Sequence, residues 1–242
     1  MTSKIKYAII GAGCMGQEHI LNIEIIDDAE VIALCDTSEK SIKESLDLLN
    51  NDVAIFDNYI DLVEANIADA FIIATPNFTH IEVLKEVMKS EAHLLIEKPL
   101  CTTVKDCQEF EKLAVDYPGV IWTAMEYRYM PPVQRMIKEI HNKTIGDLKM
   151  LSIREHRFPF LHKVDDWNRF SIKTGGTLVE KCCHFFDLMR LIAQSEPLKV
   201  YASGNQDVNH LNEKYDGMVP DILDNAFVIV DFENGVRAFL DL

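Results

Sequence analysis

The stretch KYAIIGAGCMGQEHI (residues 6–20) carries the strongest structural signal in the chain. A short apolar run ends at three glycines, Gly11, Gly13 and Gly16, and an amphipathic stretch follows. The first glycine permits a tight turn from strand to helix, the second admits a close backbone approach, and the third lets helix and strand pack closely. This G-x-G-x-x-G pattern predicts a strand–turn–helix unit whose turn holds the diphosphate of a dinucleotide. The alternative is a glycine-rich turn without a ligand.

Apolar runs alternate with amphipathic stretches through the first half of the chain. We expect buried strands in IKYAIIG, AEVIALCD, ADAFIIATP, AHLLIEKP and GVIWTAM, with VAIF as a weaker sixth. We expect helices at 14–26, 39–50, 58–65, 78–90 and 103–116. This alternation predicts an α/β fold with a doubly wound parallel sheet, and its strands end along one rim where ligands bind.

The rhythm changes after Met125, and we place a domain boundary near residue 124. We expect helices in PPVQRMIKEIHNKTI and VEKCCHFFDLMRLIAQ, and strands in LKMLSIREHRF, LKVYASGN and DNAFVIVDF. This order predicts a Rossmann domain over residues 1–124 and an α+β domain over residues 125–242, whose strands lack regular crossovers.

Composition excludes several classes of partner. The formal net charge of −15 disfavours nucleic acid and anionic membrane surfaces, both of which need a basic face. The apolar start of the chain is too short for a signal peptide, and no stretch is long enough to span a bilayer. The six cysteines show no C-x-x-C spacing, which favours reduced thiols in a cytoplasmic protein.

Asp36 bears on the identity of the dinucleotide. It ends the second predicted strand, at the position where a carboxylate accepts both hydroxyls of the adenosine ribose. A carboxylate repels a 2′-phosphate, and the next residues offer Lys40 but no arginine, so NAD is favoured over NADP.

Two further strand ends, ATPNFTH (74–80) and IEKP (96–99), lie on the same predicted rim. Their residues could be ordinary turn, cap and solvated side chains. Their position makes contact with the nucleotide plausible, whereas His19 on the first helix is more consistent with packing or a polar contact. The full set of expected cofactor contacts is Gly11, Gly13, Cys14, Met15, Gly16, Asp36, Thr37, Thr75, Pro76, Asn77, His80, Glu97 and Lys98.

The stretch VEKCCHFFDLMRLI places three ionisable residues on one predicted helix face. Glu180, His184 and Asp187 stand at i, i+4 and i+7. Such a group is often a capped or surface pair, but a histidine entering a pocket also suits the proton transfer of alcohol oxidation. A zinc site is excluded at Cys182, Cys183 and His184, because consecutive helical residues point about 100° apart; we expect no metal.

The order of these motifs resembles the Gfo/Idh/MocA family of NAD(P)-dependent sugar and inositol oxidoreductases. The resemblance rests on G-x-G-x-x-G, the aspartate after strand two, T-P-N-x-x-H, E-K-P, R-Y-M-P and the segment 165–192, and it covers essentially the whole chain. It implies a second domain with an open, mainly antiparallel sheet that often forms the oligomer interface. It also implies that Lys98 reaches the substrate hydroxyl, that His184 is the catalytic acid/base, and that Glu180 replaces the usual aspartate.

The resemblance implies hydride transfer between NAD and a secondary hydroxyl or ketone of a sugar or inositol-like polyol. Weaker substrate candidates are Arg128, Arg157 and Trp167, with Tyr129 and Arg169 behind them. Two alternatives stay open: a non-catalytic NAD-binding regulator, and an NAD-dependent glycosidase that recycles its cofactor. Family members generally continue beyond the point where this sequence stops, so the second domain is incomplete relative to them. We expect a homo-oligomer formed through the second-domain sheet.

Overall fold

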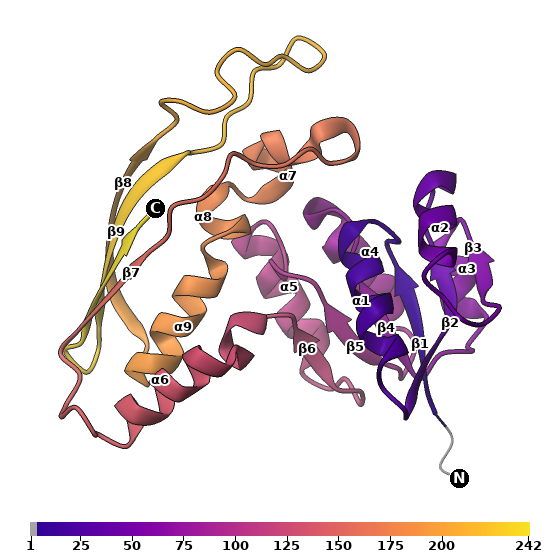
Figure 1. The fold of residues 1–242 in the computed structure, drawn as a ribbon, viewed down its shortest axis with the longest axis horizontal. Coiled ribbons are helices and arrows are strands. Elements are labelled where there is room, and N and C mark those ends of the chain that lie inside the picture. Colours follow the sequence, from indigo (N-terminus) through magenta and orange to yellow (C-terminus); the bar gives the residue numbers. More distant parts are fainter. Residues whose placement is uncertain (1–3) are drawn as a thin grey trace. The chain divides into compact units, whose positions relative to one another are not determined.

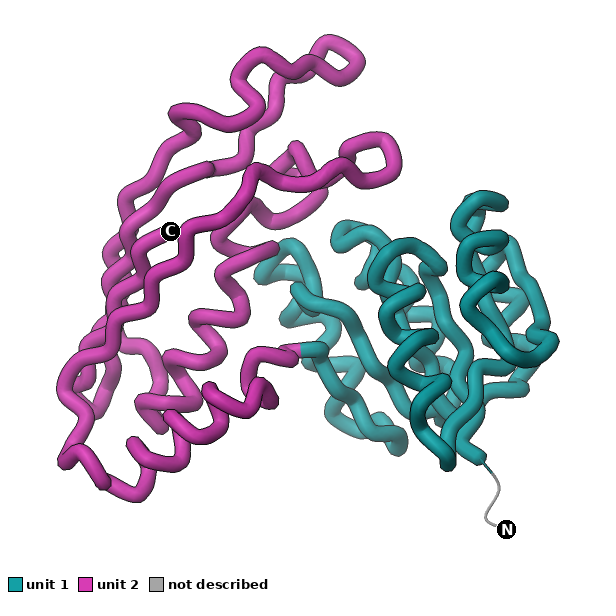
Figure 2. Tube along the Cα trace, viewed as in Figure 1, with its two compact units in different colours: residues 1–124 teal, residues 125–242 magenta. Residues whose placement is uncertain are grey.

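The computed structural model describes residues 4–242. The chain divides into two compact units, the first ending at Ala124 and the second comprising Met125–Leu242 (Figure 2). Each unit contains one β-sheet with its own hydrophobic core.

Unit 1 contains a six-stranded, fully parallel sheet (Figure 1). Its strands are β1 (Ile5–Ile10), β2 (Ala29–Cys35), β3 (Ala54–Phe56), β4 (Ala70–Ile73), β5 (His93–Ile96) and β6 (Ile121–Thr123). They lie in the order β3-β2-β1-β4-β5-β6, with every neighbouring pair parallel. The expected doubly wound Rossmann sheet is confirmed, including its weak sixth strand.

Helices connect these strands close to the expected positions. They are α1 (Cys14–Glu24), α2 (Glu39–Leu46), α3 (Tyr59–Glu64), α4 (His80–Val87) and α5 (Val104–Ala114), with a 3-10 turn η1 (Asn77–Thr79) before α4. Side chains of Ser38, Asn58 and Thr103 cap α2, α3 and α5 by accepting a backbone N–H. Such caps satisfy donors that have no acceptor within the helix. None of the helices in residues 4–242 has the length and apolar character required to cross a bilayer.

Both faces of the unit 1 sheet are buried. Ile10 packs in a core with residues of α3, α4 and α5, whereas its neighbour Ile9 packs with Ile20 and Ile23 of α1. Successive strand residues point to opposite faces, so continuously apolar strands require helices on both sides. This explains why the strands are apolar runs rather than alternating patterns.

Unit 2 is an α+β unit. It contains η2 (Glu126–Tyr129), α6 (Pro131–His141), β7 (Met150–Arg154), η3 (Val164–Arg169), α7 (Ser171–Thr174), α8 (Thr177–Glu180), α9 (Cys183–Ala193), β8 (Pro197–Asn205), β9 (Asn225–Phe232) and β10 (Arg237–Asp241). The sheet order is β7-β10-β9-β8, where β10 pairs parallel with β7 and the other two pairs are antiparallel. The expected mainly antiparallel sheet is confirmed.

Strand β10 was not expected from the sequence. It forms a hairpin with β9 through Asn234 and Gly235, and Gly235 adopts a φ of +83°. An Asn-Gly pair between two apolar runs is a strong hairpin signal, so the sequence did contain the clue.

The two faces of the unit 2 sheet differ. One face packs against α9, with Phe185 and Met189 on the helix and Val228, Val230 and Leu240 on the strands. On the opposite face Tyr201, Phe227 and Ile229 are 65%, 55% and 43% exposed. Unit 2 therefore has one covered and one open sheet face.

Candidate functional site

The three glycines of the turn in unit 1 have different surroundings: two are closely packed and one faces open space. Gly11 has a φ of +100°, and a Cβ there would lie 2.6 Å from the backbone of Ala74. A Cβ on Gly16 would lie 2.1 Å from the carbonyl oxygen of Gly11, so both positions require glycine. A Cβ on Gly13 would meet no described atom within 4 Å. Gly13 is therefore the position where another molecule can approach the backbone.

Helix α1 begins directly at this opening. Its first intrahelical hydrogen bond runs from the N–H of Gln17 to the carbonyl of Gly13 at 2.9 Å. No side chain within residues 4–242 caps this end of the helix. The first-turn N–H groups, including those of the exposed Cys14 and Met15, therefore lack an intrahelical acceptor and carry the positive end of the helix dipole. This arrangement suits a phosphate group.

Asp36 follows β2 and faces the same turn. Its Oδ2 accepts the N–H of Ala12 at 2.8 Å, and its Oδ1 accepts the N–H of Ser38 at 2.8 Å. Each carboxylate oxygen can accept a second hydrogen bond, so the group can also take the two hydroxyls of a ribose. Thr37 lies exposed beside it.

The loop after β4 contains an unsatisfied donor. Asn77 is 7% exposed, and its Nδ2 has no hydrogen-bond partner among the described residues. Buried amide donors are seldom left without an acceptor. Thr75, whose hydroxyl accepts that of Thr79 at 2.8 Å, and Pro76 complete this loop. These residues fit a dinucleotide that supplies an acceptor to Asn77.

The structure corrects the expectation for His80. Its side chain is 0% exposed and both ring nitrogens contact backbone carbonyls, so it cannot touch a cofactor. Glu97 is also interior, at 6% exposure, with its Oε1 2.8 Å from His19 Nε2. Burial acts to raise the pKa of Glu97, but His19 and Lys98 outweigh it, so the pKa lies below its ordinary value. Lys98 itself is half-buried, directly after β5.

In unit 2, the expected single helix over 179–194 is wrong. Helix α8 ends at Glu180, and α9 begins at Cys183. Glu180 and His184 therefore lie on different helices, and only His184 and Asp187 of the expected face share a helix. No glycine or proline marks the break; it accompanies the burial of Cys182, which is 0% exposed in the core. Cys182 is thus also a packing residue, and all six cysteines are free thiols.

His184 is held in the interior of unit 2. It is 3% exposed, and its ring stacks on Tyr127 with centroids 4.1 Å apart and planes 9° from parallel. Its Nε2 lies 3.4 Å from Glu126 Oε1. Sequence reasoning missed Glu126 and Tyr127, because nothing in the sequence indicates that the segment before α6 packs on His184.

The two acidic residues of the expected face have separate partners. Glu180 is 4% exposed, and its Oε1 lies 3.1 Å from Lys181 Nζ. Asp187 forms a bidentate ion pair with Arg128 of η2, which raises the pKa of Arg128. Arg128 thus ties η2 to α9.

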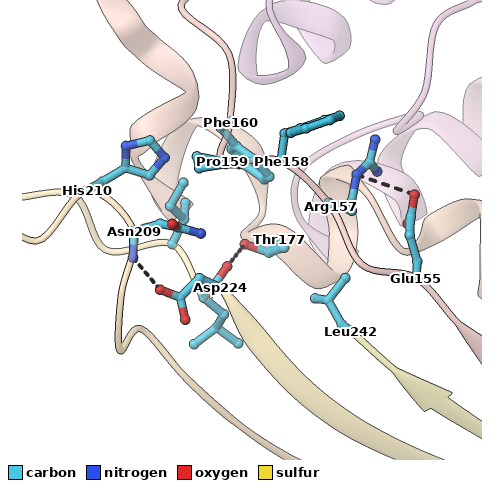
Figure 3. Close-up of a pocket in the computed structure, with 12 residues that line it drawn as sticks. Glu155, Arg157, Phe158, Pro159, Phe160, Thr177, Asn209, His210, Asp224 and Leu242 are labelled. Carbon is cyan, nitrogen blue, oxygen red and sulfur yellow. Dashed lines mark hydrogen bonds and ion pairs between the residues drawn. The ribbon is translucent and has the colours of Figure 1, made fainter.

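A pocket in unit 2 includes another expected residue, Arg157. Arg157 and Glu155 follow β7, Thr177 begins α8, and Asn209 and His210 come from the connection between β8 and β9 (Figure 3). Glu155 Oε2 and His210 Nε2 are buried and, within the described chain, have no hydrogen-bond partner. A carboxylate oxygen accepts a hydrogen bond, and an imidazole nitrogen accepts or donates one, so this pair suits a hydroxyl-bearing ligand, whose hydroxyls do both.

Of the three remaining candidates, Tyr129 ends η2 and is 49% exposed, and Trp167 and Arg169 lie in η3. Trp167 is half-buried. Arg169 is 1% exposed and is held by Glu213 at 3.1 Å, so it serves the interior and cannot meet a substrate.

Together, the glycine turn, the uncapped start of α1 and the carboxylate after β2 define a dinucleotide-binding Rossmann protein with an added α+β unit. The chain belongs to the Gfo/Idh/MocA oxidoreductase family: the family's NAD-binding Rossmann fold matches residues 5–125, and its C-terminal alpha/beta domain matches residues 137–242. Its cofactor class is therefore NAD, bound by unit 1.

The chain is similar in sequence to several named bacterial proteins. The chain is 28% identical over 241 residues to the uncharacterized oxidoreductase YrbE of Bacillus subtilis, covering 100% of this chain and 67% of YrbE. It is 27% identical over 239 residues to the myo-inositol 2-dehydrogenase of Thermotoga maritima, covering 98% of this chain and 68% of that protein. The chain thus spans about two thirds of the length of these relatives.

Solved structures share the fold. The myo-inositol 2-dehydrogenase from Lactobacillus plantarum superposes with a TM-score of 0.84 at 20% identity, covering 99% of this chain and 69% of that one. GenD2 from gentamicin A biosynthesis, solved in complex with NAD, has a TM-score of 0.85 at 18% identity, covering 100% and 66%.

Proposed function

We propose that this protein is an NAD-dependent dehydrogenase that transfers hydride between the nicotinamide and a secondary hydroxyl or ketone of a sugar or inositol-like polyol. Family membership gives the oxidoreductase class and the cofactor. The named relatives include an inositol dehydrogenase, which supports the polyol class.

The observation that carries the proposal is the environment of His184. A buried imidazole, stacked on Tyr127 and 3.4 Å from a carboxylate of Glu126, has a fixed ring orientation. Alcohol oxidation requires such a group to accept the hydroxyl proton, since a base acts only when it is positioned. Imidazole is the side chain best suited in general to proton transfer at physiological pH.

NAD, when bound, supplies the hydride acceptor. We assign the diphosphate to the N–H groups at Gly13, Cys14 and Met15, and the adenosine ribose to Asp36. The donor of Asn77 and the Thr75–Pro76 segment would hold the remainder of the cofactor. These assignments rest on the open space at Gly13 and the unsatisfied Nδ2 of Asn77.

The catalytic roles follow from the resemblance to the family, which points to Lys98, His184 and Glu180. Lys98 donates a hydrogen bond to the reacting oxygen and stabilises negative charge as the alkoxide develops. His184 takes the proton, and Glu180 orients it or binds a neighbouring hydroxyl. Arg157 binds a hydroxyl in the pocket of unit 2, with Arg128 and Trp167 as further contacts.

The test is a substrate screen followed by matched variants. Inositols, aldoses and their amino or deoxy derivatives are incubated with NAD or NADP, and the absorbance of the reduced cofactor is followed. We expect NADH formation with a polyol. Lys98→Ala and His184→Ala should each lower kcat by about 100- to 10,000-fold, the range of a positioned acid or base, while the Kd for NAD stays within a few-fold.

Two control variants separate chemistry from folding. Lys105→Ala removes an exposed lysine of α5, and His141→Ala removes a histidine that contacts the carbonyl of Leu191 at 3.1 Å. Both should retain turnover. NAD binding without turnover of any polyol, or turnover of a glycoside without net NADH, would contradict the dehydrogenase proposal.

A further inference from the structure

Lys98 lies between two residues that each contact a histidine of a helix, the half-buried His19 and the fully buried His80. On its N-terminal side, Glu97 accepts a hydrogen bond from His19 of α1 at 2.8 Å, and its Oε2 accepts the N–H of Lys98 at 3.2 Å. On its C-terminal side, the carbonyl of Pro99 lies 2.9 Å from Nδ1 of His80, the first residue of α4. The backbone of Lys98 is therefore restrained from two different helices.

His80 also contacts a second loop. Its Nε2 lies 3.0 Å from the carbonyl of Thr75, while its Nδ1 is also 3.3 Å from the carbonyl of Leu100. The two loops follow β4 and β5, which are parallel neighbours, so both lie at the same edge of the sheet. One loop contains the unsatisfied Asn77, and the other contains Lys98. A single ring therefore spans the two loops.

The position of His80 is itself fixed. The side chain is 0% exposed, and the following turns of α4 place Val83 and Leu84, at 2% and 0% exposure, in the core. Carbonyl oxygens only accept hydrogen bonds, so the ring serves both loops fully when both nitrogens carry a proton. Burial is the main influence on the pKa of His80 and lowers it, whereas the three carbonyls stabilise the protonated ring. A neutral ring donates to the carbonyl of one loop and, because it is fully buried between the two, still packs against the carbonyl of the other.

We propose that His80 is a positioning residue that joins the cofactor loop after β4 to the loop of Lys98 and fixes the ammonium-bearing residue relative to that edge of the sheet. The proposal rests on the role assigned to Lys98 under the proposed function. His80 acts through backbone carbonyls and does not touch cofactor or substrate.

The test compares His80→Ala, His80→Gln and a matched control, Val87→Ala. Val87 is fully buried at the other end of α4, so its truncation destabilises the same helix without touching either loop. The first readout is amide hydrogen exchange across residues 74–77 and 97–101. His80→Ala should accelerate exchange at least about tenfold in both segments and leave β1 unchanged, because local opening is confined to the released loops.

The second readout is steady-state kinetics with the polyol found in the screen. His80→Ala should lower kcat by about 10- to 100-fold, since small displacements of a reacting group cost that much. His80→Gln keeps an amide N–H donor that can serve one of the two loops. Its kcat and its exchange rates should lie between those of the wild type and His80→Ala. Val87→Ala should lower Tm while leaving loop exchange and kcat near those of the wild type.

The outcomes separate this proposal from the proposed function. If His80→Ala only lowers Tm, as Val87→Ala does, with exchange in both loops unchanged, the positioning role is overturned. If His80→Ala does not fold, exchange in His80→Gln decides in the same way. If the wild-type chain turns over no polyol, the proposed function fails, while the exchange data still show whether His80 holds the two loops together.

Discussion

The carboxylate of Asp36 closes the glycine turn: its Oδ2 accepts the N–H of Ala12 at 2.8 Å, although the two residues are 24 positions apart. This bond holds the end of β2 against the turn that follows β1. Asp36 therefore both shapes the turn and presents oxygens with unused lone pairs. We propose that the same carboxylate accepts hydrogen bonds from the hydroxyls of the adenosine ribose.

Replacing Asp36 should change cofactor preference. Asp36→Ala removes the acceptor for the ribose hydroxyls and the repulsion toward a 2′-phosphate. We expect the Kd for NAD to rise by about tenfold or more, with a smaller rise for NADP, because loss of a hydrogen bond to a charged group costs about 1.5–3 kcal/mol. Calorimetry with both cofactors measures this. An unchanged ratio of the two Kd values would place the ribose elsewhere.

Gly13 and Gly16 should respond differently to the same substitution. Gly16→Ala would bring a Cβ to 2.1 Å from the Gly11 carbonyl oxygen, so we expect a lower Tm. Gly13→Ala meets no described atom within 4 Å, so Tm should change little while NAD affinity falls, because the methyl group occupies the approach to the diphosphate. Thermal melts with and without NAD test both variants. Unchanged NAD affinity in Gly13→Ala would contradict the assignment of the diphosphate to this turn.

Acid should weaken unit 2 through Glu213. Hydrogen bonds from His210, Tyr215 and Arg169 lower the pKa of Glu213 from 4.5 to about 2, although partial burial opposes them. Its folded-state pKa is depressed, so the stabilisation is present above the unfolded-state value of 4.5 and is lost as the pH falls toward about 2.

The variant Glu213→Gln should therefore be less stable than the wild type at pH 7 and differ from it less at pH 3. Urea unfolding at the two pH values measures this. As a control, Glu233→Gln replaces an exposed glutamate of the same unit and should leave the pH dependence unchanged. A constant difference between Glu213→Gln and wild type across this range would rule out the ionised network.

The open face of the unit 2 sheet should mediate self-association. Tyr201, Ile229 and Phe239 face one another across β8, β9 and β10 in one register row, and Phe227 stacks on Phe239 with centroids 5.6 Å apart. We expect a homo-oligomer in light scattering at micromolar concentration. Ile229→Glu should shift it toward monomer, because a charge on an apolar interface is costly to bury. Val115→Glu, at a 75% exposed site in unit 1, should not. A monomeric wild type would remove the proposal.

The extent of sequence-based prediction differs between the two units. In unit 1, the strands are short apolar runs and most are followed by glycine, a capping residue or proline, so local chemistry identifies nearly every element. The role of Gly11 also follows from its neighbours, because a turn at a φ of +100° tolerates glycine alone. In unit 2, Asn234 and Gly235 are a hairpin signal, but the strand expectations stop at β9 and do not include β10.

The amino-acid sequence alone determined the parallel Rossmann sheet, the glycine turn after β1 and the position of a carboxylate after β2, because periodicity, glycine geometry and residue order act over short distances. It did not establish the break between Glu180 and Cys183, the stacking of His184 on Tyr127 or the burial of His80 between two loops. These features depend on contacts between residues far apart in the chain. Packing and desolvation across such distances override a helical pattern that is locally continuous.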